Sequence, residues 1–141
     1  MRALPFLVIG LVACQAGVPT FDVTVDHPVE VTLRRGEDAY FGAQPLHLLF
    51  REVPQDSRCP TDVQCVWAGN GMVRLEVALG ESPDTPRDLN TTLDPTSTVV
   101  GGYRITLLRL LPDPVSTSQI PQDAYRAQLR VERSGIAQPL D

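Results

Sequence analysis

The chain has 141 residues, a net charge of −5 at neutral pH and a sequence pI of about 4.9. Its length fits one domain, and its 43% hydrophobic residues exclude a wholly disordered chain. The acidic balance argues against nucleic-acid binding, which requires a basic face. The 13 prolines and 10 glycines indicate many turns and little helix.

The N-terminal segment has the features of a lipoprotein signal peptide. Arg2 supplies a positive charge, and residues 3–12 form an apolar run that is too short to span a bilayer core of about 30 Å. The run ends in Leu-Val-Ala directly before Cys14, which is similar to a bacterial lipobox. The alternative is a buried cysteine in an apolar strand. We therefore predict a signal peptide over residues 1–13, lipidation of Cys14, and a tether over residues 14–20.

Lipidation of Cys14 would determine where the protein resides. Each buried methylene of an acyl chain is worth about 0.8 kcal/mol, so two or three palmitate-like chains would hold the domain on a membrane stably. We expect a location in the bacterial cell envelope, on a periplasmic or surface face, with the membrane as a partner through the anchor. Residue 15 is Gln, and in a Gram-negative cell the resemblance to sorted lipoproteins then implies the outer membrane.

The rest of the chain alternates apolar and polar residues with the period of β-strands. In chain order, this pattern predicts strands over residues 21–25, 29–33, 39–41, 46–50, 73–79, 89–93, 103–107 and 125–131. The prolines of residues 80–87 predict a loop, and the paired leucines at 107–108 indicate a bulge or a fully buried central strand. Seven or eight strands over residues 21–133 favour an antiparallel, immunoglobulin-like β-sandwich, with a small β-barrel as the alternative. Residues 134–141 are expected to form a tail.

Two cysteines remain if Cys14 carries lipid. Cys59 and Cys65 form an even pair in an exported chain, which predicts a structural disulfide. A redox site would more often be C-x-x-C, and a zinc site needs more ligands than this pair supplies. The histidines, His27 and His47, are far apart in the sequence. We therefore predict no metal site and no cofactor.

The segment 56–71 (DSRCPTDVQCVWAGNG) is the most distinctive motif. Its residues indicate a disulfide-stapled loop followed by a tight Gly-Asn-Gly turn, with Arg58 paired to Asp56 or to Asp62. In one interpretation the motif is a structural corner in which Trp67, the single tryptophan, covers the disulfide. In the other, Arg58, Trp67 and Asn70 form an exposed recognition patch.

This motif resembles one found in small exported bacterial proteins, many of them predicted lipoproteins, which carry a DSRCP segment, a second cysteine and a following WAGN. The similarity is most convincing over residues 29–79, where an RGE turn, a strand, the motif and an alternating strand follow one another. The resemblance implies export and a β fold, and it supplies no reaction.

Residues for catalysis are sparse. Neither histidine is accompanied by a nucleophile signature, and His47 is expected to face solvent because it lies opposite the apolar residues of its strand. We therefore expect a non-enzymatic, lipid-anchored envelope protein with a binding or structural role toward an envelope protein or small ligand. One alternative is an inhibitor of exported proteases that presents the proline-rich loop 112–122. Another is a metal-binding or hydrolytic enzyme built on His47 and nearby carboxylates.

Overall fold

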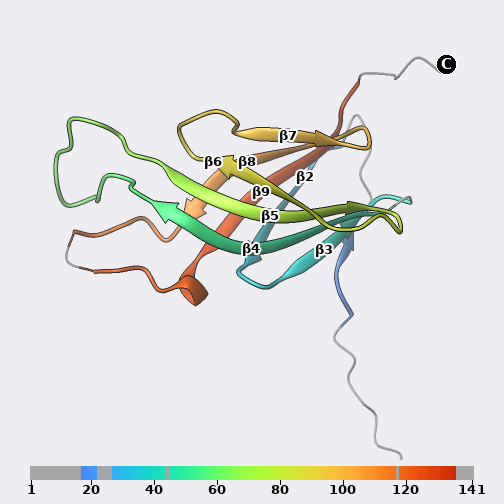
Figure 1. Ribbon diagram of the computed structural model, residues 1–141, viewed down its shortest axis with the longest axis horizontal. Helices are drawn as coiled ribbons and strands as arrows, with labels where there is room; N and C mark the ends of the chain where they lie inside the picture. The colour runs from blue at the N-terminus through green and yellow to red at the C-terminus, as the bar shows by residue number, and fades with distance from the viewer. Residues whose placement is uncertain (1–16, 22–26, 44, 117, 136–141) are drawn as a thin grey trace, which may run out of the picture.

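The computed structural model describes residues 17–21, 27–43, 45–116 and 118–135, and it is all-β (Figure 1). A single 3₁₀ turn, η1 (Gln122–Ala124), precedes the last strand of this described part. The strands are β1 (Thr20–Phe21), β2 (Val29–Arg34), β3 (Asp38–Phe41), β4 (Leu46–Asp56), β5 (Gly71–Leu79), β6 (Thr85–Asn90), β7 (Ser97–Val100), β8 (Tyr103–Leu111) and β9 (Arg126–Arg133).

The strands form two sheets that pack face to face. The first sheet has five strands in the order β1-β3-β4-β5-β6, and the second has four in the order β2-β9-β8-β7. All neighbours run antiparallel except β1 and β3, which are parallel. The two sheets are not closed into a barrel, so the predicted antiparallel β-sandwich is confirmed.

The period-two pattern of the sequence determines which side chains form the core. Alternate residues of β4, β5, β8 and β9 point between the sheets, where the apolar side chains lose contact with water. The largest fully buried side chains are Tyr103, Phe41, Phe50, Leu46, Leu48, Leu75, Leu89, Ile105, Leu110, Leu129, Val73 and Val77. This core fixes both sheets and therefore the positions of the loops that join them.

Several predicted strand limits need correction. The loop expected over residues 80–87 is wrong from Thr85 onward, where β6 begins; Pro86 is tolerated because β6 is an edge strand. The alternation also missed β7 altogether, since Ser-Thr-Val-Val carries no clear period. The predicted bulge in β8 is confirmed by a register shift between Leu107 and Arg109. For the strand expected over 21–25, residues 22–26 lie outside the described residues.

Three long loops gather at one end of the sandwich, which we call the loop end. They are residues 57–70, 91–96 and 112–121, at the left of Figure 1. Strand β1 lies at the opposite end, because Phe21 pairs with Phe41 and Phe41 pairs with Leu46, the first residue of β4. Within the described residues, no helix is long and apolar enough to cross a bilayer.

Candidate functional site

The motif loop 57–70 is stapled at its base. Cys59 and Cys65 form a disulfide with 5.9 Å between their Cα atoms, so this prediction is confirmed. Backbone hydrogen bonds from Ser57 to Asn70 (2.7 Å) and from Cys59 to Ala68 (2.9 Å) continue the β4–β5 ladder into the loop. The two ends of the loop thus extend the sheet beyond β4 and β5.

Gly69 permits the close approach of the two sides of this loop. Its φ is +69°, and a Cβ atom there would lie 1.8 Å from the Ser57 carbonyl oxygen. The expected tight turn over residues 69–71 is wrong, because Gly71 already pairs with Asp56 as the first residue of β5. The whole of loop 57–70 closes the β4–β5 hairpin instead.

Arg58 ties the motif loop to the second sheet. Its Nε and Nη2 donate to the two carboxylate oxygens of Asp56 at 2.8 and 2.7 Å. Its Nη1 donates to the Leu110 carbonyl at 2.6 Å, and Nη2 also donates to the Pro112 carbonyl at 3.0 Å. The side chains of Arg58 and Asp56 are only 11% and 12% exposed. Of the two predicted partners, Asp56 is therefore the one that pairs with Arg58, and the pair joins the end of β4 to the end of β8.

Tyr125 completes this cluster from the segment before β9. Its hydroxyl donates to Asp56 Oδ2 at 2.9 Å. Burial and the nearby carboxylate raise the pKa of Tyr125 to about 12. Burial opposes ionisation of Asp56, but the hydrogen bonds from Arg58 and Tyr125 outweigh it and hold the pKa of Asp56 below its ordinary value. At neutral pH the cluster is a carboxylate, a guanidinium and a neutral phenol.

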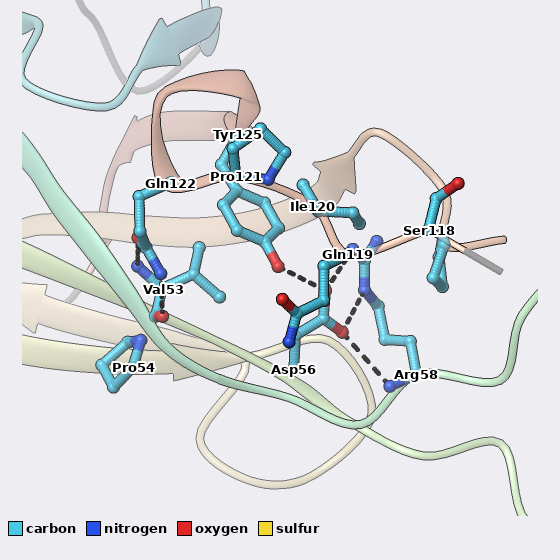
Figure 2. A pocket seen from close by; sticks show the side chains of 11 residues that line it. Val53, Pro54, Asp56, Arg58, Ser118, Gln119, Ile120, Pro121, Gln122 and Tyr125 are labelled. Carbon is cyan, nitrogen blue, oxygen red and sulfur yellow. Dashed lines mark hydrogen bonds and ion pairs between the residues drawn. The ribbon is translucent and has the colours of Figure 1, made fainter. Parts of the chain in front are cut away.

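A cavity of about 490 Å³ opens beside this cluster, and Figure 2 shows its lining. Its main polar groups are already engaged with the protein. Gln122 Oε1 accepts from the Val53 amide at 3.1 Å, and Gln122 Nε2 donates to the Val53 carbonyl at 2.9 Å. Asp56 and Arg58 are bound to each other as described. These groups brace loop 112–121 against β4, and the side chains of Ser118 and Gln119 add further polar groups to the lining.

Asn70 braces the other side of the motif loop. It is 7% exposed, and its Nδ2 donates to Asn90 Oδ1 at 2.7 Å. Its Oδ1 accepts from the Thr92 amide at 3.2 Å. The Thr92 hydroxyl in turn donates to the Gly69 carbonyl. Asn70 is therefore a structural residue that ties loop 57–70 to loop 91–96.

Trp67 lies at the surface of this braced loop. Its side chain is 81% exposed, and the preceding Val66 is 88% exposed. The interpretation in which the indole packs over the disulfide is therefore wrong. A shallow groove of about 360 Å³, which we call the Trp67 groove, runs between loops 57–70 and 91–96. Its lining is Ser57, Trp67, Ala68, Gly69, Asn70, Thr92 and Leu93.

The three residues of the predicted recognition patch do not lie together on an open face. Trp67 is exposed, whereas Asn70 is buried and the guanidinium of Arg58 is directed inward onto Asp56. The exposed neighbour of Trp67 is instead Leu93, which is 59% exposed and lies across the groove. Sequence reasoning missed Leu93 because it was assigned to the end of a strand.

His47 has a more defined environment than the sequence indicated. It lies on the outer face of the sheet, opposite the apolar residues of β4 as expected, but neighbouring side chains largely cover it. Its side chain is 17% exposed and stacks on Tyr40 with ring centroids 4.8 Å apart. Its two ring nitrogens each lie 3.1 Å from a carboxylate oxygen, of Asp38 and of Asp84. Among the described residues, no three His, Cys, Asp or Glu side chains gather in a way that could hold a metal ion.

Comparisons with protein-family models, with curated proteins and with solved structures found no match for this chain. Cys14, the predicted lipidation site, lies outside the described residues. The candidate site is therefore defined by the geometry of the loop end, where Trp67 and Leu93 are exposed on a framework fixed by Asp56, Arg58 and Asn70.

Proposed function

We propose that this protein is a lipid-anchored, non-enzymatic binding protein of the bacterial cell envelope, and that it binds through its loop end. The observation that carries the binding role is the exposure of Trp67 and Val66 on a loop that is fixed on both sides. Isolated surface apolar residues are common, but an exposed tryptophan beside further apolar side chains favours an interaction site. The anchoring role is supported by the lipobox-like sequence that ends at Cys14.

The framework of the loop end suits binding rather than catalysis. The largely buried polar side chains of the loop end form hydrogen bonds that hold the loops in place. These side chains are Asp56, Arg58, Asn70 and Tyr125. A rigid loop loses little conformational entropy when it binds, so its apolar contacts translate more fully into affinity. The hydrogen-bonded ends of loop 57–70 thus hold the backbone on either side of the exposed Trp67.

The anchoring part is tested by expressing the full chain and its Cys14→Ser variant in a bacterial host supplied with an alkyne-tagged palmitate. We expect the wild-type chain to carry label and to sediment with membranes, and the variant to lose both. Cys59→Ser is the matched control, because it removes a cysteine of the disulfide and should keep the label. Label or membrane retention in Cys14→Ser would overturn the anchor.

The non-enzymatic part is tested by incubating the purified full chain in detergent with envelope extracts and scoring hydrolysis products. We expect no turnover above that of a mock purification. A turnover that one substitution at His47, Asp38 or Asp84 abolishes would overturn this part of the proposal, because those side chains form the one histidine–carboxylate cluster described above.

A further inference from the structure

The structure assigns a docking role to the Trp67 groove. The groove binds a protein partner that presents an apolar side chain flanked by basic residues. This inference rests on the proposed function, because the anchor at Cys14 limits which surfaces the loop end can reach. Three features of the loop end argue for this partner. They are the hydrogen-bonding capacity of the groove, the charge of the loops, and the distance between the loop end and the anchor.

Apart from the exposed indole N–H of Trp67, the polar side chains that line the groove already have hydrogen-bond partners within the protein. The Ser57 hydroxyl donates to the Asn70 carbonyl at 3.1 Å and accepts from the Asn70 amide at 3.1 Å. The Asn70 side chain is bound to Asn90 and Thr92, and the Thr92 hydroxyl donates to Gly69. A glycan or polar metabolite requires free donors and acceptors, whereas an apolar side chain requires none. The groove therefore favours an aliphatic or aromatic side chain.

The exposed charged side chains of the three loops at the loop end are aspartates. Asp62 and Asp94 are exposed, and Asp113 is exposed beside its partner Arg109. Hydrogen bonds from the Ser116 hydroxyl and amide hold the pKa of Asp62 below its ordinary value, so it stays ionised.

Among the described residues of loops 57–70, 91–96 and 112–121, Arg58 is the one cation, and it is directed inward. The exposed Arg109 of β8 pairs with Asp113, so Asp62 and Asp94 supply the uncompensated charge. A partner with basic residues is attracted to this surface, whereas a second copy of the chain or an anionic lipid surface is repelled.

The anchoring membrane is an unsuitable target for the loop end. Strand β4 runs from Leu46 beside β1 to Asp56 at the loop end, about 33 Å at roughly 3.3 Å per residue. The tether from Cys14 to Thr20 spans about 21 Å when fully extended. End-on insertion of the loop end into that membrane would need a tether longer than the sandwich. End-on insertion of the loop end into that membrane is therefore excluded, and proteins of the same compartment are the more suitable partners.

The test is photo-crosslinking of the full chain in its bacterial host. A photoreactive amino acid replaces Val66, which is exposed beside Trp67 and does not line the groove. The matched control replaces Val99, which is 46% exposed on β7 beside the turn at the opposite end of the sandwich. Adducts are identified by mass spectrometry down to the crosslinked peptide, and membrane retention is measured in the same samples.

We expect an adduct from position 66 and none from position 99, with the crosslinked peptide of a second protein carrying an apolar residue flanked by Lys or Arg. In the position-66 chain, Trp67→Ala should lower the adduct yield at least tenfold, and Asp94→Arg should lower it several-fold. Glu81→Arg, an exposed charge reversal in the loop between β5 and β6, should leave it unchanged.

Four results would overturn the inference: an adduct with lipid, an adduct with a second copy of the chain, a crosslinked peptide without basic residues, or no adduct at position 66 above the control. If the chain is retained on membranes while one of these occurs, the docking inference fails and the anchor stands. If the chain is not retained on membranes, the proposed function itself fails.

Discussion

Replacing Asp56 by alanine tests the claim that the motif is a brace for the loop end. The substitution removes the acceptor for two guanidinium bonds of Arg58 and for the hydroxyl of Tyr125. It leaves a guanidinium that is 11% exposed with only two carbonyl partners. Charge-assisted hydrogen bonds are worth about 1.5–3 kcal/mol, and breaking a buried pair costs about 3–5 kcal/mol. We expect the free energy of unfolding to fall by about 3 kcal/mol.

The assay is urea unfolding followed by far-ultraviolet circular dichroism, with the disulfide kept oxidised. At a slope of about 2 kcal/mol per molar urea, the midpoint should fall by about 1.5 M. Asp113→Ala is the matched control, since it breaks an aspartate–arginine pair whose side chains are 46% and 55% exposed. That control should cost less than about 1 kcal/mol. Equal losses for Asp56→Ala and Asp113→Ala would refute the reasoning.

The wild-type protein and Asp56→Ala also give a pH test, in which the direction of the stability change follows from the pKa shift of Asp56. The pKa of Asp56 is lowered by its hydrogen bonds in the folded protein, from an ordinary value of 3.8. Its stabilisation is therefore complete above the unfolded-state pKa and is lost as the pH falls through the folded-state pKa. The difference in free energy of unfolding between wild type and Asp56→Ala should be constant from neutral pH down to about the ordinary pKa of 3.8. It should become smaller at lower pH.

Three further predictions concern the same loop end. Replacing both Cys59 and Cys65 by serine should lower the free energy of unfolding by about 2 kcal/mol, from the entropy of the short loop they close; an unchanged urea midpoint would contradict this. Gly69→Ala should destabilise the fold, because the residue has a φ of +69° and its Cβ would lie 1.8 Å from the Ser57 carbonyl oxygen; a lowered midpoint of thermal unfolding measures this. In a spectrophotometric titration, Tyr125→Phe should lack the phenol component near pH 12, and the stability that Tyr125 contributes should be present below pH 10 and lost as the pH rises through about 12.

The sandwich could be predicted because its strands bury one face and expose the other. In β5 the alternation of Val73, Leu75 and Val77 with polar residues is complete, and the strand lies where the pattern predicts it. The start of β6 could not be found in this way, because Pro86 signals a loop unless it is known that the strand lies at a sheet edge. The position of an edge is a property of the whole sheet and is not written in the local sequence.

The site was harder to predict for a similar reason. The pairings of Cys59 with Cys65 and of Arg58 with Asp56 are local, since they join residues a few positions apart. The first was predicted, whereas the sequence left Asp62 as an alternative partner of Arg58. The partners that decide exposure are distant: Arg58 is turned inward by the Leu110 carbonyl, and Asn70 is buried by Asn90. Because of these long-range contacts, Arg58 and Asn70 of the predicted recognition patch have structural roles. Trp67 is the member of that patch that is exposed.

The central claim is that one cysteine anchors the chain and the other two brace the loop end that binds. Intact mass spectrometry of the protein purified from bacterial membranes tests this most directly. We predict a chain that begins at Cys14, carries the added mass of a diacylglyceryl group, and shows no free thiol at Cys59 or Cys65 before reduction. A chain that retains Met1 and has an unmodified Cys14 thiol would contradict the account.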